Sequence, residues 1–166
     1  DRTGADFFKV VEDIRNKLGA SAIPVQIPFG KEADFKGVID ILSKKLYLFD
    51  EKELGMNVTE QNIPAEYEEQ AEKALKNLIE ILAEVYEEIM PFFLDDKNPP
   101  VDLIEKSIRK KTISGEIVPV LCGTAFKYKG IQPLLDAVVK YLPSPVDIWE
   151  FKGIDPDSED KVIVRT

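Results

Sequence analysis

The sequence predicts an α/β fold in which a parallel sheet is interrupted by an inserted α+β subdomain. Two short apolar segments, at 22–28 and 116–122, have the character of buried strands, and each adjoins a segment with helical periodicity. About 85 residues of different character separate these two strand–helix blocks, and a plain loop of that length is rare in a compact domain. We therefore expect a separate subdomain between them.

The first block begins with a predicted helix over residues 5–18. Its apolar residues recur at spacings of three and four, which places them on one face: Phe7, Val10, Val11, Ile14 and Leu18. Gly19 is the expected stop, because glycine readily adopts the left-handed conformation that often ends a helix. The apolar run 22–28 follows between turn-forming residues and predicts a buried strand.

The first part of the insertion predicts a small antiparallel sheet. Segments 35–42 and 45–49 have strand composition around a tight turn at Ser43-Lys44, and 57–63 is a candidate for a third strand.

Two helices complete the predicted insertion. Pro64 opens a long helix that extends to about residue 90, since proline fits the first turn of a helix. Its apolar stripe consists of Tyr67, Ala71, Leu75, Leu78, Leu82, Val85 and Ile89. A shorter helix over 102–111 follows the break at Asn98-Pro99-Pro100 and has the stripe Leu103, Ile104 and Ile108.

The second block joins the predicted strand 116–122 to a helix over 130–142. The residues expected to face inward are Ile131, Leu134, Leu135, Val138, Val139 and Leu142. Pro143 and Pro145 end this helix, because proline cannot continue the hydrogen-bond ladder. A strand-like stretch at 161–166 has no evident pairing partner. Since the chain also starts without methionine, we expect both ends to be cuts in a longer protein.

The composition excludes several classes of function. The chain has 22 Lys and Arg against 31 Asp and Glu, a formal net charge of -9, which gives no global support for nucleic-acid binding. With no histidine and the single Cys122, we expect neither a metal cluster, a disulfide nor an activated serine nucleophile. No apolar run approaches the roughly 20 residues that cross a bilayer. A reducing cytoplasm fits these features best.

The segment Gly123-Thr-Ala-Phe-Lys127 is the most informative short motif. It lies where a predicted buried strand gives way to a loop and a helix, and open α/β sheets bind ligands at such carboxyl strand ends. The same five residues also fit a plain strand-to-helix turn in which glycine supplies backbone freedom. The motif alone favours the plain turn.

Longer stretches of the sequence favour the ligand-binding interpretation over the plain turn. They are Asp1-Arg-Thr-Gly-Ala-Asp6-Phe7, Ala22-Ile-Pro-Val-Gln-Ile-Pro-Phe-Gly30, Phe35-Lys-Gly-Val-Ile-Asp40, Lys129-Gly-Ile-Gln132 and Tyr141-Leu-Pro-Ser-Pro-Val-Asp147. In this order and spacing, they make the chain resemble elongation factor G, a translational GTPase family. The resemblance implies the C-terminal part of a P-loop NTPase-type sheet. Residues 1–30 and 114–145 would belong to the G domain, 31–113 to the inserted subdomain, and 146–166 to a linker and the start of a β-barrel domain.

The resemblance also implies a guanine site. Asp1 would be the last residue of the Asn-Lys-x-Asp motif, whose carboxylate accepts hydrogen bonds from guanine N1 and the 2-amino group. Thr124, Ala125 and Phe126 match the second base-contacting loop, in which the Ala125 N–H would meet the guanine oxygen and the Thr124 hydroxyl would steady Asp1. Threonine stands where the family usually has serine, and its extra methyl restricts the rotamer.

The same resemblance implies GTP or GDP with Mg²⁺ in the intact protein, held by segments that this sequence does not contain. There is no Gly-x-x-x-x-Gly-Lys-Ser/Thr loop, so we assign no catalytic residue and no metal ligand, and expect this chain alone to be inactive and to bind nucleotide weakly. The implied partners are the ribosome and the C-terminal domain of its stalk protein, in a bacterial cytoplasm or an organellar matrix. No membrane contact and no direct nucleic-acid site are expected.

The predicted long helix is strongly acidic on its polar face. Candidate stalk-binding residues are Glu69, Glu72, Glu80, Glu84 and Glu87, which could attract a basic partner helix. A charged helix face is more often simply solvated. An alternative function is therefore a stand-alone acidic protein-interaction module that binds no nucleotide.

Overall fold

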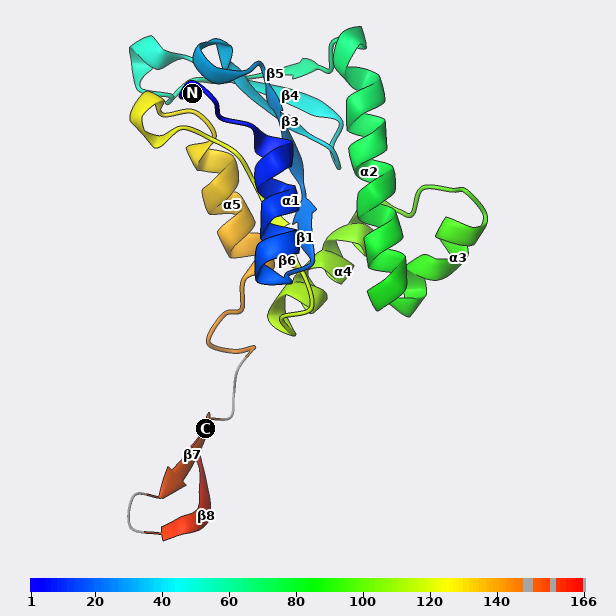
Figure 1. Ribbon diagram of the computed structural model, residues 1–166, viewed down its shortest axis with the longest axis vertical. Helices are drawn as coiled ribbons and strands as arrows, with labels where there is room; N and C mark the ends of the chain where they lie inside the picture. The colour runs from blue at the N-terminus through cyan, green and yellow to red at the C-terminus, as the bar shows by residue number, and fades with distance from the viewer. Residues whose placement is uncertain (148–150, 156–157, 166) are drawn as a thin grey trace.

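The computed structural model describes residues 1–147, 151–155 and 158–165 (Figure 1). It confirms the predicted fold class, because a small parallel sheet and a separate four-stranded antiparallel sheet are combined with helices. The elements between the two halves of the parallel sheet are those of the antiparallel sheet and three α-helices.

The parallel sheet contains β1 (Ala22–Pro24) and β6 (Val118–Val120), two strands far apart in the sequence. Helix α1 (Phe7–Leu18) leads into β1 and ends at Gly19, as the sequence predicts. Asp6 is the N-cap, and its side chain accepts a hydrogen bond of 3.1 Å from the Lys9 N–H. Gly19 ends the helix at φ 63°, in the left-handed region that glycine tolerates.

The run 22–28, expected to be one strand, is divided between two sheets. Val25 is the pivot: its N–H donates to the Val120 carbonyl (3.1 Å), and its carbonyl accepts from the Ile41 N–H (3.4 Å). Before it, β1 pairs with β6, and after it, β2 (Gln26–Phe29) pairs with the first strand of the insertion. The prediction of one continuous strand was wrong because apolar character does not specify which neighbour supplies the backbone partners.

The antiparallel sheet has the order β2-β3-β4-β5, one strand more than predicted. Its other members are β3 (Gly37–Asp40), β4 (Lys45–Phe49) and β5 (Val58–Asn62). The expected turn joins β3 to β4, where the Asp40 carboxylate accepts from the N–H groups of Leu42 and Ser43 at 2.9 and 2.8 Å. Two short 3-10 turns flank the hairpin, η1 (Glu32–Asp34) and η2 (Glu51–Glu53).

The predicted helix over 64–90 ends early. Helix α2 (Ala65–Val85) stops where Tyr86 takes extended angles, and the chain continues as η3 (Glu87–Ile89) and the short helix α3 (Met90–Leu94). Pro91 lies in the first turn of α3, where a helix does not need its N–H, so it fits the start of a new helix better than the interior of a continued α2. Pro64 is the N-cap of α2 and therefore precedes its first turn.

The remaining helices match their predicted positions closely. Helix α4 (Val101–Ile113) follows the proline break, and α5 (Ile131–Tyr141) follows β6 after the 3-10 turn η4 (Ala125–Lys127). The predicted strand at 161–166 lies mostly in β8 (Ser158–Arg165), which does have a partner, β7 (Phe151–Asp155). Residues 148–150, 156–157 and 166 of the predicted linker and strand lie outside the described residues.

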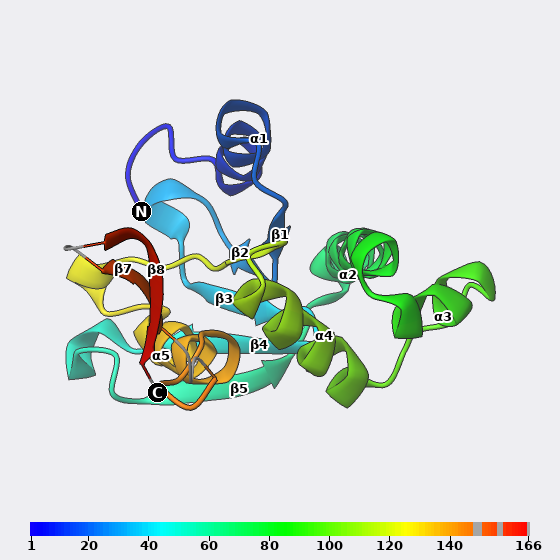
Figure 2. The ribbon, with the colours of Figure 1, turned by 90° about the horizontal axis from the view of Figure 1, so that it is seen from below.

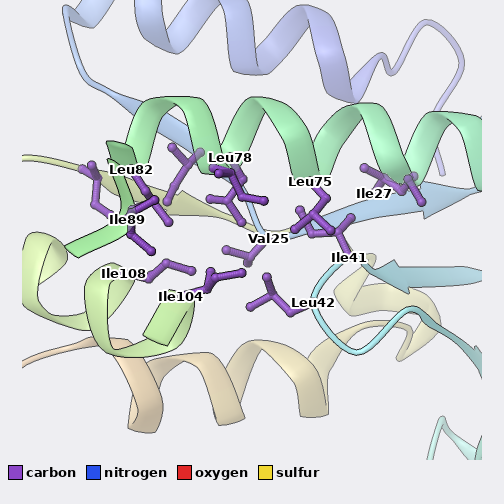
Figure 3. Packing of buried hydrophobic residues seen from close by; sticks show 14 of the residues in the cluster. Val25, Ile27, Ile41, Leu42, Leu75, Leu78, Leu82, Ile89, Ile104 and Ile108 are labelled. Atoms are coloured by element: carbon purple, nitrogen blue, oxygen red, sulfur yellow. The ribbon is translucent and has the colours of Figure 1, made fainter. Parts of the chain in front are cut away.

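The principal core lies between α2, α4 and the two strands that meet at Val25 (Figure 3). Leu78 and Leu82 of α2 point toward Ile104 and Ile108 of α4, and all four are 2% exposed or less. β1 contacts both α1 and α2 and therefore connects this core to the parallel sheet (Figure 1). The insertion thus contains most of the buried apolar residues.

Candidate functional site

A pocket of about 300 Å³ brings the first residue of the chain to the end of β6. Its wall includes Asp1, Gly30, Glu32, Phe35, Cys122 and Gly123. Asp1 and the residues after β6 are therefore neighbours, as the resemblance implies for a base pocket. Gly30 directly precedes the insertion, and Glu32 and Phe35 come from its start, which sequence reasoning did not assign to this pocket.

Two glycines fix the shape of the loop after β6. A Cβ on Gly123 would lie 2.7 Å from the Lys129 carbonyl oxygen, and one on Gly130 would lie 2.7 Å from the Cys122 carbonyl oxygen. Gly130 also has φ +81°, in the region that only glycine adopts freely. The two ends of the loop therefore approach more closely than side chains would allow.

The three loop residues singled out by sequence have different surroundings. Thr124 is buried, and its N–H donates to the Lys129 carbonyl at 2.9 Å while its carbonyl accepts from the Lys129 N–H at 3.1 Å. Ala125 is exposed and starts η4, where the first amide of a helix lacks an intrahelical acceptor. Phe126 is 88% exposed. None of the three is among the residues that line the 300 Å³ pocket, which ends at Gly123.

The predicted contact between Thr124 and Asp1 stays a prediction. Within residues 1–147, no hydrogen bond joins the Thr124 hydroxyl to the Asp1 carboxylate. The two residues are connected through the pocket wall, since Asp1 and the neighbouring Gly123 both line it.

Lys129 is a site residue that sequence reasoning missed. Its side chain is 6% exposed, its Nζ donates to the Phe35 carbonyl at 2.8 Å, and it forms an ion pair with Glu51. The hydrogen bond from Lys129 holds the pKa of the Glu51 carboxyl below its usual range. The signal that could have indicated this role is the position of a lysine directly before Gly130, at the closing end of a glycine-bounded loop.

Cys122, the only cysteine, is not poised for chemistry. Burial raises the pKa of its thiol to about 12, so the group stays protonated at neutral pH. Its side chain packs against the cluster of Phe35, Val38 and Phe49 from the antiparallel sheet. Cys122 is thus part of the contact between the end of β6 and the insertion.

The acidic residues proposed from the sequence all lie on the surface. Glu69, Glu72, Glu80 and Glu84 are exposed along α2, and in residues 1–147 none of them forms an ion pair. Glu87 is also exposed but lies in η3, beyond the break, so the prediction that it continues the face of α2 was wrong. Glu80 lines a groove with Lys76 and Lys97, but these lysines form ion pairs with Asp96 at 3.8 Å and Asp95 at 3.0 Å, so they add no net positive charge to that end of the face.

Neither a metal-binding group of side chains nor a membrane-spanning helix is found among the described residues. Over the described ranges 1–147, 151–155 and 158–165, no group of three or more His, Cys, Asp or Glu side chains is placed to hold a metal ion. None of the helices in those ranges combines the length and apolar character that a membrane span requires.

Comparisons with known proteins agree with the resemblance found in the sequence. The chain is 44% identical over 160 residues to elongation factor G of Rhodopseudomonas palustris (strain BisB18), a match that covers 96% of the chain and 23% of that protein. A crystal structure of a Thermus thermophilus protein has the same fold, with a TM-score of 0.75 at 23% identity over 90% of the chain and 22% of that protein. No protein-family model matches. The predicted resemblance to elongation factor G is therefore confirmed, for a chain that spans about a quarter of its relative's length.

Proposed function

We propose that this chain contributes the guanine-recognition end of a translational GTPase. The observation that carries the proposal is the pocket of about 300 Å³ that both Asp1 and Gly123 line. A carboxylate and the carboxyl end of a parallel strand meet there, which is where open α/β sheets bind ligands. The 44% identity to elongation factor G supports the choice of guanine as that ligand.

The chemistry of the proposed site is a set of hydrogen bonds to the base edge. The Asp1 carboxylate would accept from guanine N1–H and the 2-amino group, a pair of donors that adenine does not present. The Ala125 N–H, the first amide of η4, would donate to the guanine oxygen. A wrong base would leave the carboxylate unpaired, which costs more than the hydrogen bond itself contributes.

The activity of the intact protein belongs to the same proposal. By its similarity to elongation factor G, it would hydrolyse GTP with Mg²⁺ in the cytoplasm and drive translocation of transfer RNAs and messenger RNA on the ribosome. Residues 1–30 and 114–145 would form its G-domain part, 31–113 its inserted subdomain, and 146–166 the linker and the start of a β-barrel domain. Because phosphate-binding loops would come from other segments, we expect no GTP hydrolysis by the 166-residue chain itself.

Replacing Asp1 tests the base assignment. In the complete gene product, Asp1→Asn should weaken GDP binding and raise the relative affinity for XDP, because an amide can donate to the 2-oxo group of xanthine. Calorimetric titration of both nucleotides measures the change in preference. Asp13→Asn, an exposed change on α1, is the matched control and should leave both affinities unchanged. An unaltered preference for GDP over XDP in the Asp1 variant would contradict the assignment.

The α2 surface supports a second, independent proposal: contact with a basic partner, the C-terminal domain of the ribosomal stalk protein. Glu69, Glu72 and Glu84 are exposed without an ion pair in residues 1–147, so their field is not neutralised internally. Binding should be detectable by titration at low salt and weaken at high salt, because salt screens exposed charges. Glu84→Lys should weaken it and Glu12→Lys on α1, with the same charge change, should not. No binding at low salt would remove this proposal.

A further inference from the structure

We propose that Lys129 is a positioning residue through which the antiparallel sheet region holds the loop of the candidate base pocket. The consequence for nucleotide binding rests on the function proposed above. The contact between Lys129 and the insertion does not depend on that function, because the structure shows it directly.

The backbone of Lys129 closes the loop. It both donates to and accepts from Thr124, at 3.1 and 2.9 Å, which forms an isolated antiparallel bridge around η4. Any movement of Lys129 therefore moves Thr124 and, with it, the Ala125 amide that follows. The loop has its own internal bonds, but these do not fix where it lies relative to the pocket.

The side chain of Lys129 supplies that external attachment. A buried ammonium group requires hydrogen-bond and charge partners, because leaving it unpaired out of water is costly. Both partners of Lys129 come from the insertion: the Phe35 carbonyl after η1 and the Glu51 carboxylate in η2. Phe35 also lines the pocket, so one residue both contributes to the pocket and holds the Lys129 side chain through its carbonyl.

A second set of contacts holds the loop after β6 against the turn at η2. The Gln132 Nε2 donates to the Gly55 carbonyl at 2.5 Å, and a Cβ on Gly55 would lie 2.1 Å from the Tyr128 carbonyl oxygen. Figures 1 and 2 both show the loop after β6 beside the turn at η2. The two segments are therefore in close backbone contact as well as joined by the ion pair.

The opposite wall has a weaker attachment to the insertion. The Gly4 N–H, three residues after Asp1, donates to the Glu32 carboxylate at 2.7 Å, but both groups are exposed. Glu32 lies in η1, one turn before Phe35. The insertion thus contacts both walls of the pocket, with its buried contact at Lys129.

The test combines hydrogen exchange with nucleotide affinity in the complete gene product. In Lys129→Met, amide exchange of residues 123–130 should accelerate about tenfold, and the affinities for GDP and IDP should fall by the same factor of about ten. IDP lacks the 2-amino group but keeps the oxygen that the Ala125 amide would meet, so an equal fall indicates displacement of the loop. Exchange of residues 37–49 should not change.

Two further variants keep the test decisive. Glu51→Ala alters only a half-exposed carboxylate, so this variant should fold normally even if Lys129→Met does not. It should accelerate amide exchange of the loop about threefold. Lys52→Met, the loss of an exposed lysine in the same turn, is the control and should change nothing.

The outcomes separate this inference from the proposed function. Unchanged loop exchange in the Glu51 and Lys129 variants would overturn the positioning role, and faster exchange with unchanged GDP affinity would overturn its link to the base. If the wild-type protein bound no guanine nucleotide, the proposed function would fail, while the exchange data would still report on the attachment of the loop.

Discussion

Helices of the insertion and helices that flank the parallel sheet have the same apolar periodicity, but their apolar faces differ in burial. In the insertion, Leu82 of α2 and Ile108 of α4 are completely buried. On the flanking helices, Leu18 of α1 is 75% exposed and Val139 of α5 is 82% exposed. Sequence reasoning expected all of these positions to face inward, and that expectation was wrong for most of the stripe on α5.

The difference shows that amphipathicity identifies a helix but does not supply the surface that covers it. In the insertion, α2 packs against α4 and against strands, so its stripe is covered from more than one side. In the part of the chain that is described, α1 packs against β1 and α5 packs against α4, and the parallel sheet beside them has only two strands. Such a sheet is too narrow to bury two apolar helix faces, and apolar surface is therefore left exposed.

Truncation of a core residue should produce the largest effect. Leu82→Ala should lower the free energy of unfolding by about 3 kcal/mol, because it removes buried methyl groups and leaves a cavity between α2 and α4. Val139→Ala, the matched truncation on α5, should change it by less than about 0.5 kcal/mol. Urea denaturation followed by circular dichroism measures both. Equal losses would mean that the face of α5 is buried in solution.

A smaller effect is expected at Arg109, which connects the two regions. From α4, its guanidinium donates to the Lys140 and Leu142 carbonyls at 2.9 and 3.0 Å and to Asp147 at 2.7 Å. Arg109→Ala should cost about 1 kcal/mol, since these groups are partly hydrated, and should accelerate amide exchange at the end of α5. Lys106→Ala, one turn earlier on α4, is the control. A loss as large as that of Leu82→Ala would contradict this ranking.

A still smaller, pH-dependent effect is expected at Asp147. Hydrogen bonds from the Ser144 side chain and backbone, with Arg109 nearby, hold the pKa of the Asp147 carboxyl below its ordinary value of 3.8. A lowered folded-state pKa contributes stability above the unfolded-state value, and that contribution is lost as the pH falls through the folded-state pKa. Asp147→Asn should therefore lower the urea midpoint at neutral pH, and the gap from the wild type should close as the pH falls below 3.8. A difference in urea midpoint that widened in acid would contradict this prediction.

The smallest effect on stability, but a visible one on association, is expected from Val139→Glu. The side chain is already in water, so folding should be almost unaffected. The added charge should reduce self-association of the 166-residue chain through its exposed apolar surface, measured by light scattering at high concentration. A clean monomer in the wild-type chain would show that this surface does not drive association.

The elements that could be predicted are those encoded by local chemistry. The end of α1 at Gly19 matches the prediction because it depends on a single residue and its nearest amides. The turn after Asp40 matches for the same reason. The division of 22–28 at Val25 could not be predicted in this way, because it depends on partners far along the chain.

The candidate site was only partly accessible from the sequence. Asp1 and the loop at 124–126 were proposed through a family resemblance, and the structure adds that Asp1 and Gly123 line one pocket. The contributions of Phe35 and Lys129 could not be inferred from periodicity, since they are 94 positions apart. Their contact exists only because the chain passes from the parallel to the antiparallel sheet at Val25, which brings the start of the insertion to the loop after β6.

The sequence by itself determined the fold class, most helix positions and the likeness to elongation factor G, because periodicity, caps and ordered motifs are local or linear properties. Only the tertiary structure decided which apolar faces are covered and which buried charge finds a partner. Lys129 is the clearest case, because its ammonium group is stable in the interior only where Phe35 and Glu51 are brought to it. That arrangement depends on pairings between distant segments, which no single stretch of sequence specifies.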